Sequence, residues 1–118
     1  MKGKYIMTKV KAKDKVHYVN NKEFYEAIRI YINQCKIADQ METELPRVPE
    51  YIGECFFKIA QRIATKPNFT NYTFKEDMIL DGVENCLRYI RNFNPDKSKN
   101  QFSYFTTVIT YSFLRRIE

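Results

Sequence analysis

The sequence predicts an all-α fold, a compact domain of four helices. Only three glycines and four prolines occur in 118 residues, whereas an all-β fold needs many turns built from such residues. The hydrophobic content of 44% is enough to close a core without disulfides or a metal. The length fits one domain, which excludes a multidomain enzyme.

A basic segment precedes the predicted helices. Seven lysines and one acid, Asp14, lie in residues 1–22, so this stretch carries the whole net charge of +6. Residues 1–19 show no helical period and are predicted to form a flexible basic arm, to which we assign no residue-level role. Residues 20–118 are predicted to form the helical domain. No glycine or proline ends its last helix, so we expect a fragment of a slightly longer protein.

The first two helices have clear start signals. Asn20 followed by Glu23 is a capping-box pattern, and the apolar residues after it recur at helical spacing, which predicts a helix over about 21–38. Pro46 and Pro49 come next, and either can sit in a first helical turn, where the missing N–H is not needed. A second apolar stripe follows them and predicts a helix over about 49–65.

The third and fourth helices are separated by a proline. Thr73 and Glu76 form another capping box, which predicts a helix from Thr73 to about residue 93 with Leu87 on its buried side. Pro95 stops this helix, because proline cannot supply the N–H that continuation requires. The last helix is predicted from about 102 to the end of the chain.

The residues that catalysis or metal binding would need are scarce. His17 is the only histidine and lies in the arm, and the glycines are too far apart for a phosphate-binding loop, so we expect no enzyme and no cofactor. Three widely spaced cysteines predict reduced core thiols rather than disulfides or zinc ligands: Cys35, Cys55 and Cys86. No signal peptide or membrane span is recognisable, which predicts a cytoplasmic protein.

One face of the third helix is acidic. Asp77, Asp81 and Glu84 recur there at helical spacing, together with Arg88. Three carboxylates could hold a divalent cation. We favour a solvated helix face or a contact with a protein over a metal site.

The last helix contains five aromatic residues among the twelve from Phe102 to Phe113, and a helix cannot turn all of them toward one core. They fall on two stripes, one formed by Phe102, Phe105, Ile109 and Phe113 and the other by Tyr104, Val108, Tyr111 and Arg115. Exposed rings beside hydroxyls and arginines suit single-stranded nucleic acid, since rings stack on bases and guanidinium groups neutralise phosphate. Burial of both stripes by neighbouring helices is the other interpretation, and periodicity leaves both open.

Residues 77–117 resemble a known family. Three short motifs occur in order, Asp-Met-Ile-Leu-Asp-Gly (77–82), Asn-Phe-Asn-Pro-Asp-Lys (92–97) and Phe-Ser-Tyr-Phe-Thr-Thr (102–107). Together they are similar to the second conserved region of bacterial RNA polymerase sigma factors, and most similar to the late-transcription sigma factors of large tailed bacteriophages. Residues 20–76 match only in their helical layout, and the arm matches nothing recognisable.

The resemblance implies a transcription initiation factor that recognises and melts the minus-ten promoter element and directs phage late transcription in the host bacterial cytoplasm. The implied partners are the clamp helices of the largest subunit of the bacterial RNA polymerase core, the nontemplate strand of promoter DNA, a phage co-activator and a sliding clamp. The residues matching the polymerase contact are Asp77, Leu80, Asp81, Glu84 and Arg88. Those matching the DNA contact are Phe102, Tyr104, Phe105, Thr106, Thr107, Val108, Ser112, Arg115 and Arg116.

The resemblance also gives some residues of the last helix specific roles. Phe105 matches the aromatic residue that stacks on a flipped adenine. Val108 and Ile109 stand where the family has paired tryptophans, so the wedge at the upstream edge of the bubble is smaller here. Ser112 and Arg115 match the residues that read the last paired base, and Arg115 could contact guanine or phosphate.

Two other functions stay open. One is a helical protein-interaction module without sequence-specific DNA recognition, which would bind a protein partner through the acidic face of the third helix and use the aromatic helix as core. The other is a nonspecific nucleic-acid binder whose basic arm supplies the affinity. Exposure of Phe105 and Tyr104 on the face of Arg115 would favour the sigma-like function, and burial of both would favour the interaction module.

Overall fold

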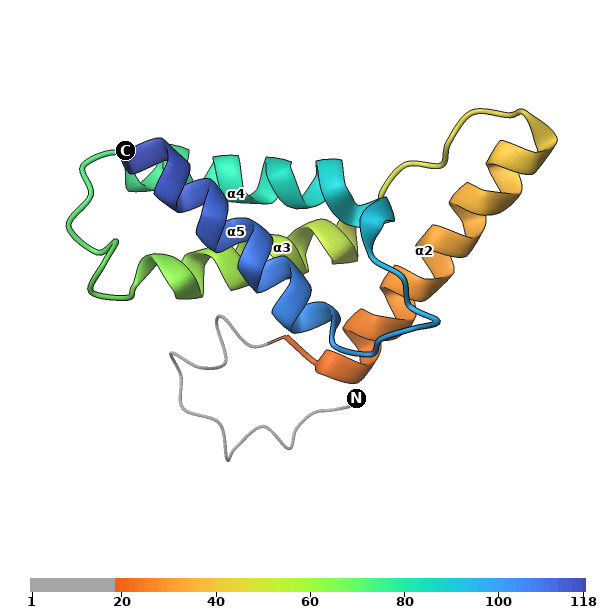
Figure 1. Cartoon of the computed structure of the whole chain (residues 1–118), viewed down its shortest axis with the longest axis horizontal. Helices are drawn as coiled ribbons and strands as arrows, with labels where there is room; N and C mark the ends of the chain where they lie inside the picture. The colour runs from red at the N-terminus through yellow and green to blue at the C-terminus, as the bar shows by residue number, and fades with distance from the viewer. Residues whose placement is uncertain (1–18) are drawn as a thin grey trace.

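A computed structural model describes residues 19–118, and this part of the chain folds into four α-helices and a short 3-10 helix (Figure 1). The helices are α2 (Asn21–Met41), α3 (Glu50–Ala64), α4 (Lys75–Tyr89), η2 (Ile90–Asn92) and α5 (Gln101–Ile117). The prediction of an all-α, four-helix domain is confirmed. The predicted basic arm lies, up to residue 18, outside the residues that the structure describes.

Side chains cap the amino termini of two of the four α-helices, α2 and α5. The amide N–H of Glu23 donates to Oδ1 of Asn20 at 3.0 Å, as the capping box requires. The prediction for Thr73 was wrong: α4 begins at Lys75, after Phe74, and has no side-chain cap. In the sequence the Thr and Glu have capping-box spacing, but the backbone at 73–74 is still in a turn.

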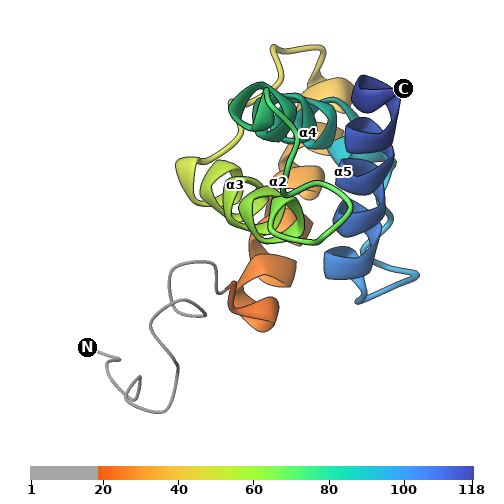
Figure 2. The ribbon, with the colours of Figure 1, turned by 90° about the vertical axis from the view of Figure 1, so that its left-hand side faces the viewer.

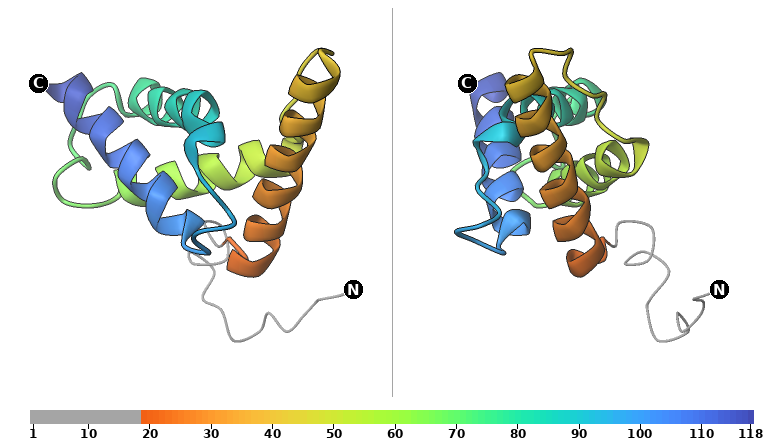
Figure 3. Two further views of the ribbon diagram at one scale, coloured as in Figure 1. Left: turned by 45° about the vertical axis from the view of Figure 1, so that its right-hand side comes forward. Right: turned by 90° about the vertical axis from the view of Figure 1, so that its right-hand side faces the viewer.

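Helices α3, α4 and α5 form the body of the domain, and α2 diverges from it. Helix α5 packs along α4, and α3 packs against both; Figure 2 shows the three side by side. Buried side chains extend along α2 from Phe24 to Ala38, and its carboxyl-terminal end projects beyond the body (Figure 3). An ion pair between Arg91 and Asp39 links η2 to α2 near that end of α2.

An aromatic cluster holds the helices together. Phe24 of α2, Phe56 of α3 and Phe105 of α5 are fully buried. The ring centroid of Phe105 lies 5.9 Å from that of Phe24 and 4.8 Å from that of Phe56. Because these rings come from three helices, α5 closes the core rather than lying on its surface. The three cysteines are free and buried, as predicted.

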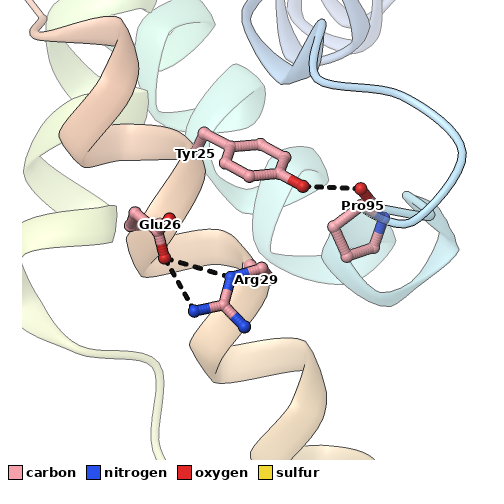
Figure 4. A network of polar contacts seen from close by, with 4 residues as sticks. All are labelled: Tyr25, Glu26, Arg29 and Pro95. Atoms are coloured by element: carbon pink, nitrogen blue, oxygen red, sulfur yellow. Dashed lines mark hydrogen bonds and ion pairs between the residues drawn. The ribbon is translucent and has the colours of Figure 1, made fainter.

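The loop between η2 and α5 is tied to the start of α2. The Tyr25 hydroxyl donates to the carbonyl of Pro95 at 2.6 Å, while Glu26 and Arg29 pair on the next face of the helix (Figure 4). The buried Gln101 side chain donates to the carbonyl of Asn21 at 3.0 Å. These contacts fix where α5 begins, and therefore which of its residues face inward.

Candidate nucleic-acid and protein interfaces on α4 and α5

The two predicted functional helices share a close seam at Gly82. A Cβ atom at this glycine would lie 3.0 Å from Cε1 of Phe113 and 3.1 Å from Cγ2 of Ile109. Glycine therefore lets α5 approach α4 more closely than any other residue would. The seam fixes the relative position of the outward faces of the two helices.

The inner face of α5 is core. Phe105, Ile109 and Phe113, four residues apart, are all 0% exposed. The expectation that the Phe105 ring is available to a base is thus corrected, because the ring fills the space between α2 and α3. To stack on a nucleotide it would have to leave the aromatic cluster.

The outer face of α5 carries a different set of groups. Thr107, Tyr111 and Arg115 also recur every four residues, and all three are exposed. Tyr111 has 59% of its surface exposed, so its ring is the most accessible in this helix. Tyr111 was not among the predicted DNA-binding residues, although its stripe, shared with Arg115, was the signal that could have identified it. We call Thr107, Tyr111 and Arg115 the outer stripe of α5.

The other predicted DNA-binding residues occupy intermediate positions. Tyr104 is half-buried, and its hydroxyl donates to the carbonyl of Tyr89 at 3.2 Å. Partial burial raises the pKa of Tyr104 above its usual value. Phe105 is thus buried and Tyr104 is half-exposed. The rings are therefore neither both exposed, as the sigma-like function predicts, nor both buried, as the interaction module predicts. The half-buried residues of the predicted set are Phe102, Tyr104, Thr106, Val108 and Arg116.

Ser112 is inside the fold rather than on the DNA face. Only 3% of its surface is exposed, and its Oγ accepts a hydrogen bond from Nδ2 of Asn85 in α4 at 3.1 Å. The prediction that Ser112 contacts a base is corrected for this reason. The residue instead connects the two helices through Asn85.

The two arginines at the end of α5 have different partners. Arg116 turns toward α4, where its Nε lies 3.2 Å from Oδ2 of Asp81 and its Nη2 lies 3.8 Å from Oδ2 of Asp77. Its charge is therefore directed at the acidic face rather than at the outer stripe. Nη2 of Arg115 instead donates to Oδ1 of Asn85 at 3.2 Å, which is a neutral partner. The positive charge of the outer stripe is carried by Arg115.

The predicted protein-binding face of α4 is not covered by the rest of the described chain. Asp77, Leu80, Glu84 and Arg88 are exposed and Asp81 is half-exposed. Leu80 exposes 58% of its surface in the middle of this set, which provides an apolar contact among charges. Glu84 and Arg88 form a long ion pair of 4.0 Å on the surface, and such pairs contribute little to stability.

A groove between α3 and α4 adjoins this face and was not predicted. It encloses about 650 Å³ and is open to solvent on one side, where Phe57 and Leu87 expose 41% and 39% of their surfaces. Leu87 was predicted on the buried side, and this is corrected. Phe57 lies outside the apolar stripe of its helix, and this position was the signal in the sequence that could have predicted its exposure. Among the lining residues are Val48, Gly53, Glu54, Phe57, Val83 and Leu87.

Three comparisons give no relative for this chain: no protein-family model, no curated protein and no solved structure matches it. Within residues 19–118, no three histidine, cysteine, aspartate or glutamate side chains are grouped so that they could hold a metal ion. None of the four α-helices described above is both long and apolar enough to cross a membrane.

Proposed function

We propose that this chain is a sigma-like transcription initiation factor. In this proposal the outer face of α4 binds the core of bacterial RNA polymerase, and the outer stripe of α5 binds the nontemplate strand of the minus-ten promoter element. The observation that carries the proposal is that a ring, a hydroxyl and a guanidinium are exposed on one stripe of α5, beside an exposed acidic face of α4.

The outer stripe has the chemistry that an unpaired strand needs. Tyr111 offers a ring for stacking on a base, Thr107 offers a hydroxyl, and Arg115 offers charge to the backbone. Flipping a base costs a few kcal/mol, and an aromatic platform returns about 1–3 kcal/mol per base. Binding energy of this size holds a short A·T-rich element open without ATP. In this proposal Tyr111 takes the stacking role that the resemblance gives to Phe105, because Tyr111 is exposed and Phe105 is buried.

The face of α4 has the chemistry of a protein contact. Leu80 supplies exposed apolar surface, and the three carboxylates of this face outnumber the two arginines that pair with them, Arg88 and Arg116, so its net charge is negative. Such a face suits a helical partner with basic residues, and charge complementarity of this kind sets specificity and association rate. The resemblance identifies that partner as the clamp helices of the polymerase core.

A binding experiment with the nontemplate strand tests the DNA surface. A fluorescent oligonucleotide with an A·T-rich minus-ten sequence is titrated with the complex of this chain and polymerase core. We expect Tyr111→Ala to weaken binding by about tenfold or more, since one stacked base is lost. Tyr51→Ala on α3 is the matched control, because that ring lines a separate groove with α2. Equal binding of a scrambled strand would contradict the proposal.

The polymerase contact is tested separately. Glu84→Lys reverses a charge in the middle of the α4 face, and we expect a several-fold loss of affinity for the core because like charges then face each other. Glu44→Lys makes the same charge change in the exposed loop after α2 and is expected to leave affinity unchanged. Equal losses for both variants would show that α4 is not the contact.

The second candidate, a helical protein-interaction module, is favoured by the groove between α3 and α4 together with the burial of Phe105. A module of this kind binds a partner at the groove and has no preference for a DNA sequence. Phe57→Ala would then abolish partner binding, and Tyr111→Ala would change nothing. Under the sigma-like proposal Tyr111→Ala is the damaging substitution.

A further inference from the structure

We infer that Asn85 is a positioning residue that orients the Arg115 guanidinium for a bidentate acceptor on the bound nucleic acid, a guanine edge or a backbone phosphate. The inference rests on the proposed function, because it concerns the outer stripe of α5. It adds a residue of α4 to the DNA surface.

The hydrogen bonds of Asn85 fix the direction of its amide. Its Nδ2 donates to the carbonyl of Asp81 at 2.9 Å and to Oγ of Ser112 at 3.1 Å. The Asp81 carbonyl can only accept, so the amide nitrogen must face it and the oxygen must face the other way; the Ser112 hydroxyl, which can donate or accept, accepts here. That oxygen accepts from Nη2 of Arg115 at 3.2 Å.

The anchor of this network belongs to two packed helices. Ser112 is buried at the seam of the two helices, and Asp81 contributes a backbone carbonyl of α4 rather than a mobile side chain. Asn85 itself is only partly exposed. The oxygen that meets Arg115 is therefore held from both α4 and α5, whereas the guanidinium that it orients lies at the exposed end of the outer stripe.

A neutral partner orients Arg115 without cancelling its charge. Arg116, the next residue, faces the carboxylates of Asp77 and Asp81 and is neutralised by them. Arg115 has an amide oxygen instead, which directs one nitrogen of the guanidinium and leaves its charge for a ligand. Its remaining N–H groups keep the planar fork that matches guanine or phosphate in a bidentate way, and a lysine could not replace it.

The orientation itself is tested without DNA by NMR of the arginine side chains in the full chain. Rotation of the Arg115 guanidinium is expected to be slow in the wild type and to become as fast as that of the exposed Arg47 in Asn85→Ala. Asn85→Asp keeps an acceptor oxygen and is expected to keep the rotation slow. Equal rotation of Arg115 and Arg47 in the wild type would overturn the inference.

Its consequence for binding is tested by a double-mutant cycle on the nontemplate oligonucleotide with polymerase core present. Asn85→Ala is expected to weaken binding about threefold or more in the wild type and not to weaken it further in Arg115→Ala, because residues in one network are coupled. Asn85→Asp places a carboxylate beside Arg115 and neutralises it, so it is expected to weaken binding while rotation of the guanidinium stays slow. If Asn85 had a merely structural role, binding and rotation would not respond differently to this substitution. Additive losses would overturn the inference, as would an Arg115→Ala variant that binds normally.

Two further arms separate the acceptors. A methylphosphonate at one position removes a phosphate charge, and 7-deazaguanine removes the N7 acceptor of guanine. The DNA modification that reduces binding of the wild type but not of Arg115→Ala identifies the group that Arg115 contacts. If neither modification reduces binding of the wild type, bidentate recognition by Arg115 is contradicted. A scrambled strand that binds as well as the minus-ten strand would defeat the proposed function alone, because the cycle can be repeated on that strand.

Discussion

The inner and outer faces of α5 differ although the same seventeen residues form both. The inner face places Phe105, Ile109 and Phe113 in the core without any exposure, and the outer face presents Thr107, Tyr111 and Arg115 to solvent. Aromatic content alone therefore does not indicate which ring meets a ligand. The direction in which each ring points is set by the seam with α4 and by the contacts with α2 and α3.

The same contrast applies to the two arginines at the end of the helix. Arg116 is one residue further along the helix and reaches the carboxylates of α4, whereas the hydrogen-bond partner of Arg115 within residues 19–118 is an amide oxygen. One step of about 100° around the helix thus separates an arginine that joins α4 and α5 from one that carries charge to the surface.

The largest expected effect is on the inner face. Phe105→Ala should lower the free energy of unfolding by about 3–5 kcal/mol, because it leaves a cavity among the rings of Phe24 and Phe56. Tyr111→Ala should change it by less than about 0.5 kcal/mol, since that ring is exposed. Urea unfolding of both variants measures the difference. Similar losses would show that the two faces are not distinct.

The next largest effect is expected at the seam between α4 and α5. Gly82→Ala places a methyl group 3.0 Å from the Phe113 ring, and such overpacking costs about 1–3 kcal/mol. The better helix propensity of alanine returns up to about 1 kcal/mol, so we expect a net loss in thermal and urea unfolding. Gly53→Ala is the matched control, because nothing lies within 4 Å of a Cβ at that position of α3. A stabilised Gly82→Ala would mean that α5 can move away without loss.

The buried thiol of Cys86 gives a smaller effect that depends on pH. Burial raises its pKa in the folded protein above the value in the unfolded chain, which is about 8.5. The folded state then holds a proton that the unfolded state loses, so this contribution is complete below about pH 8.5 and decreases as pH rises further. We expect stability to fall by at most about 1.4 kcal/mol per pH unit from this group.

Urea unfolding at pH 8 and pH 9.5 checks this expectation. Cys86→Ala should show a shallower decline over that interval than the wild type, although it is less stable at both values. Parallel declines would mean that the Cys86 thiol does not titrate differently in the two states.

The smallest expected effect is at Arg116. Its ion pairs with Asp77 and Asp81 are partly exposed, and pairs of this kind contribute about 0–1 kcal/mol. Arg116→Met should therefore barely change unfolding, and added salt should reduce the difference further. It should also weaken binding of the nontemplate strand less than Arg115→Ala does. A larger loss of binding for Arg116→Met than for Arg115→Ala would contradict the different roles of the two side chains.

The prediction of helices succeeded where the signal is local. Asn20 caps α2 as its spacing with Glu23 indicated, and Pro49 precedes α3. The start of α4 and the exposure of Leu87 were missed, because both depend on neighbouring segments rather than on periodicity. Phe105 and Ser112 were assigned to DNA by position in a motif, and their burial depends on where α2 and α4 lie.

The sequence by itself determined the helical fold, the extent of its helices to within a few residues, and the acidic face of α4, because propensity, capping and helical spacing are local properties. Only the tertiary structure decided which aromatic ring of α5 is core, which arginine is paired, and that Asn85 meets Arg115. These properties depend on how closely α5 approaches α4 at Gly82, and that distance is set by packing between segments far apart in the chain.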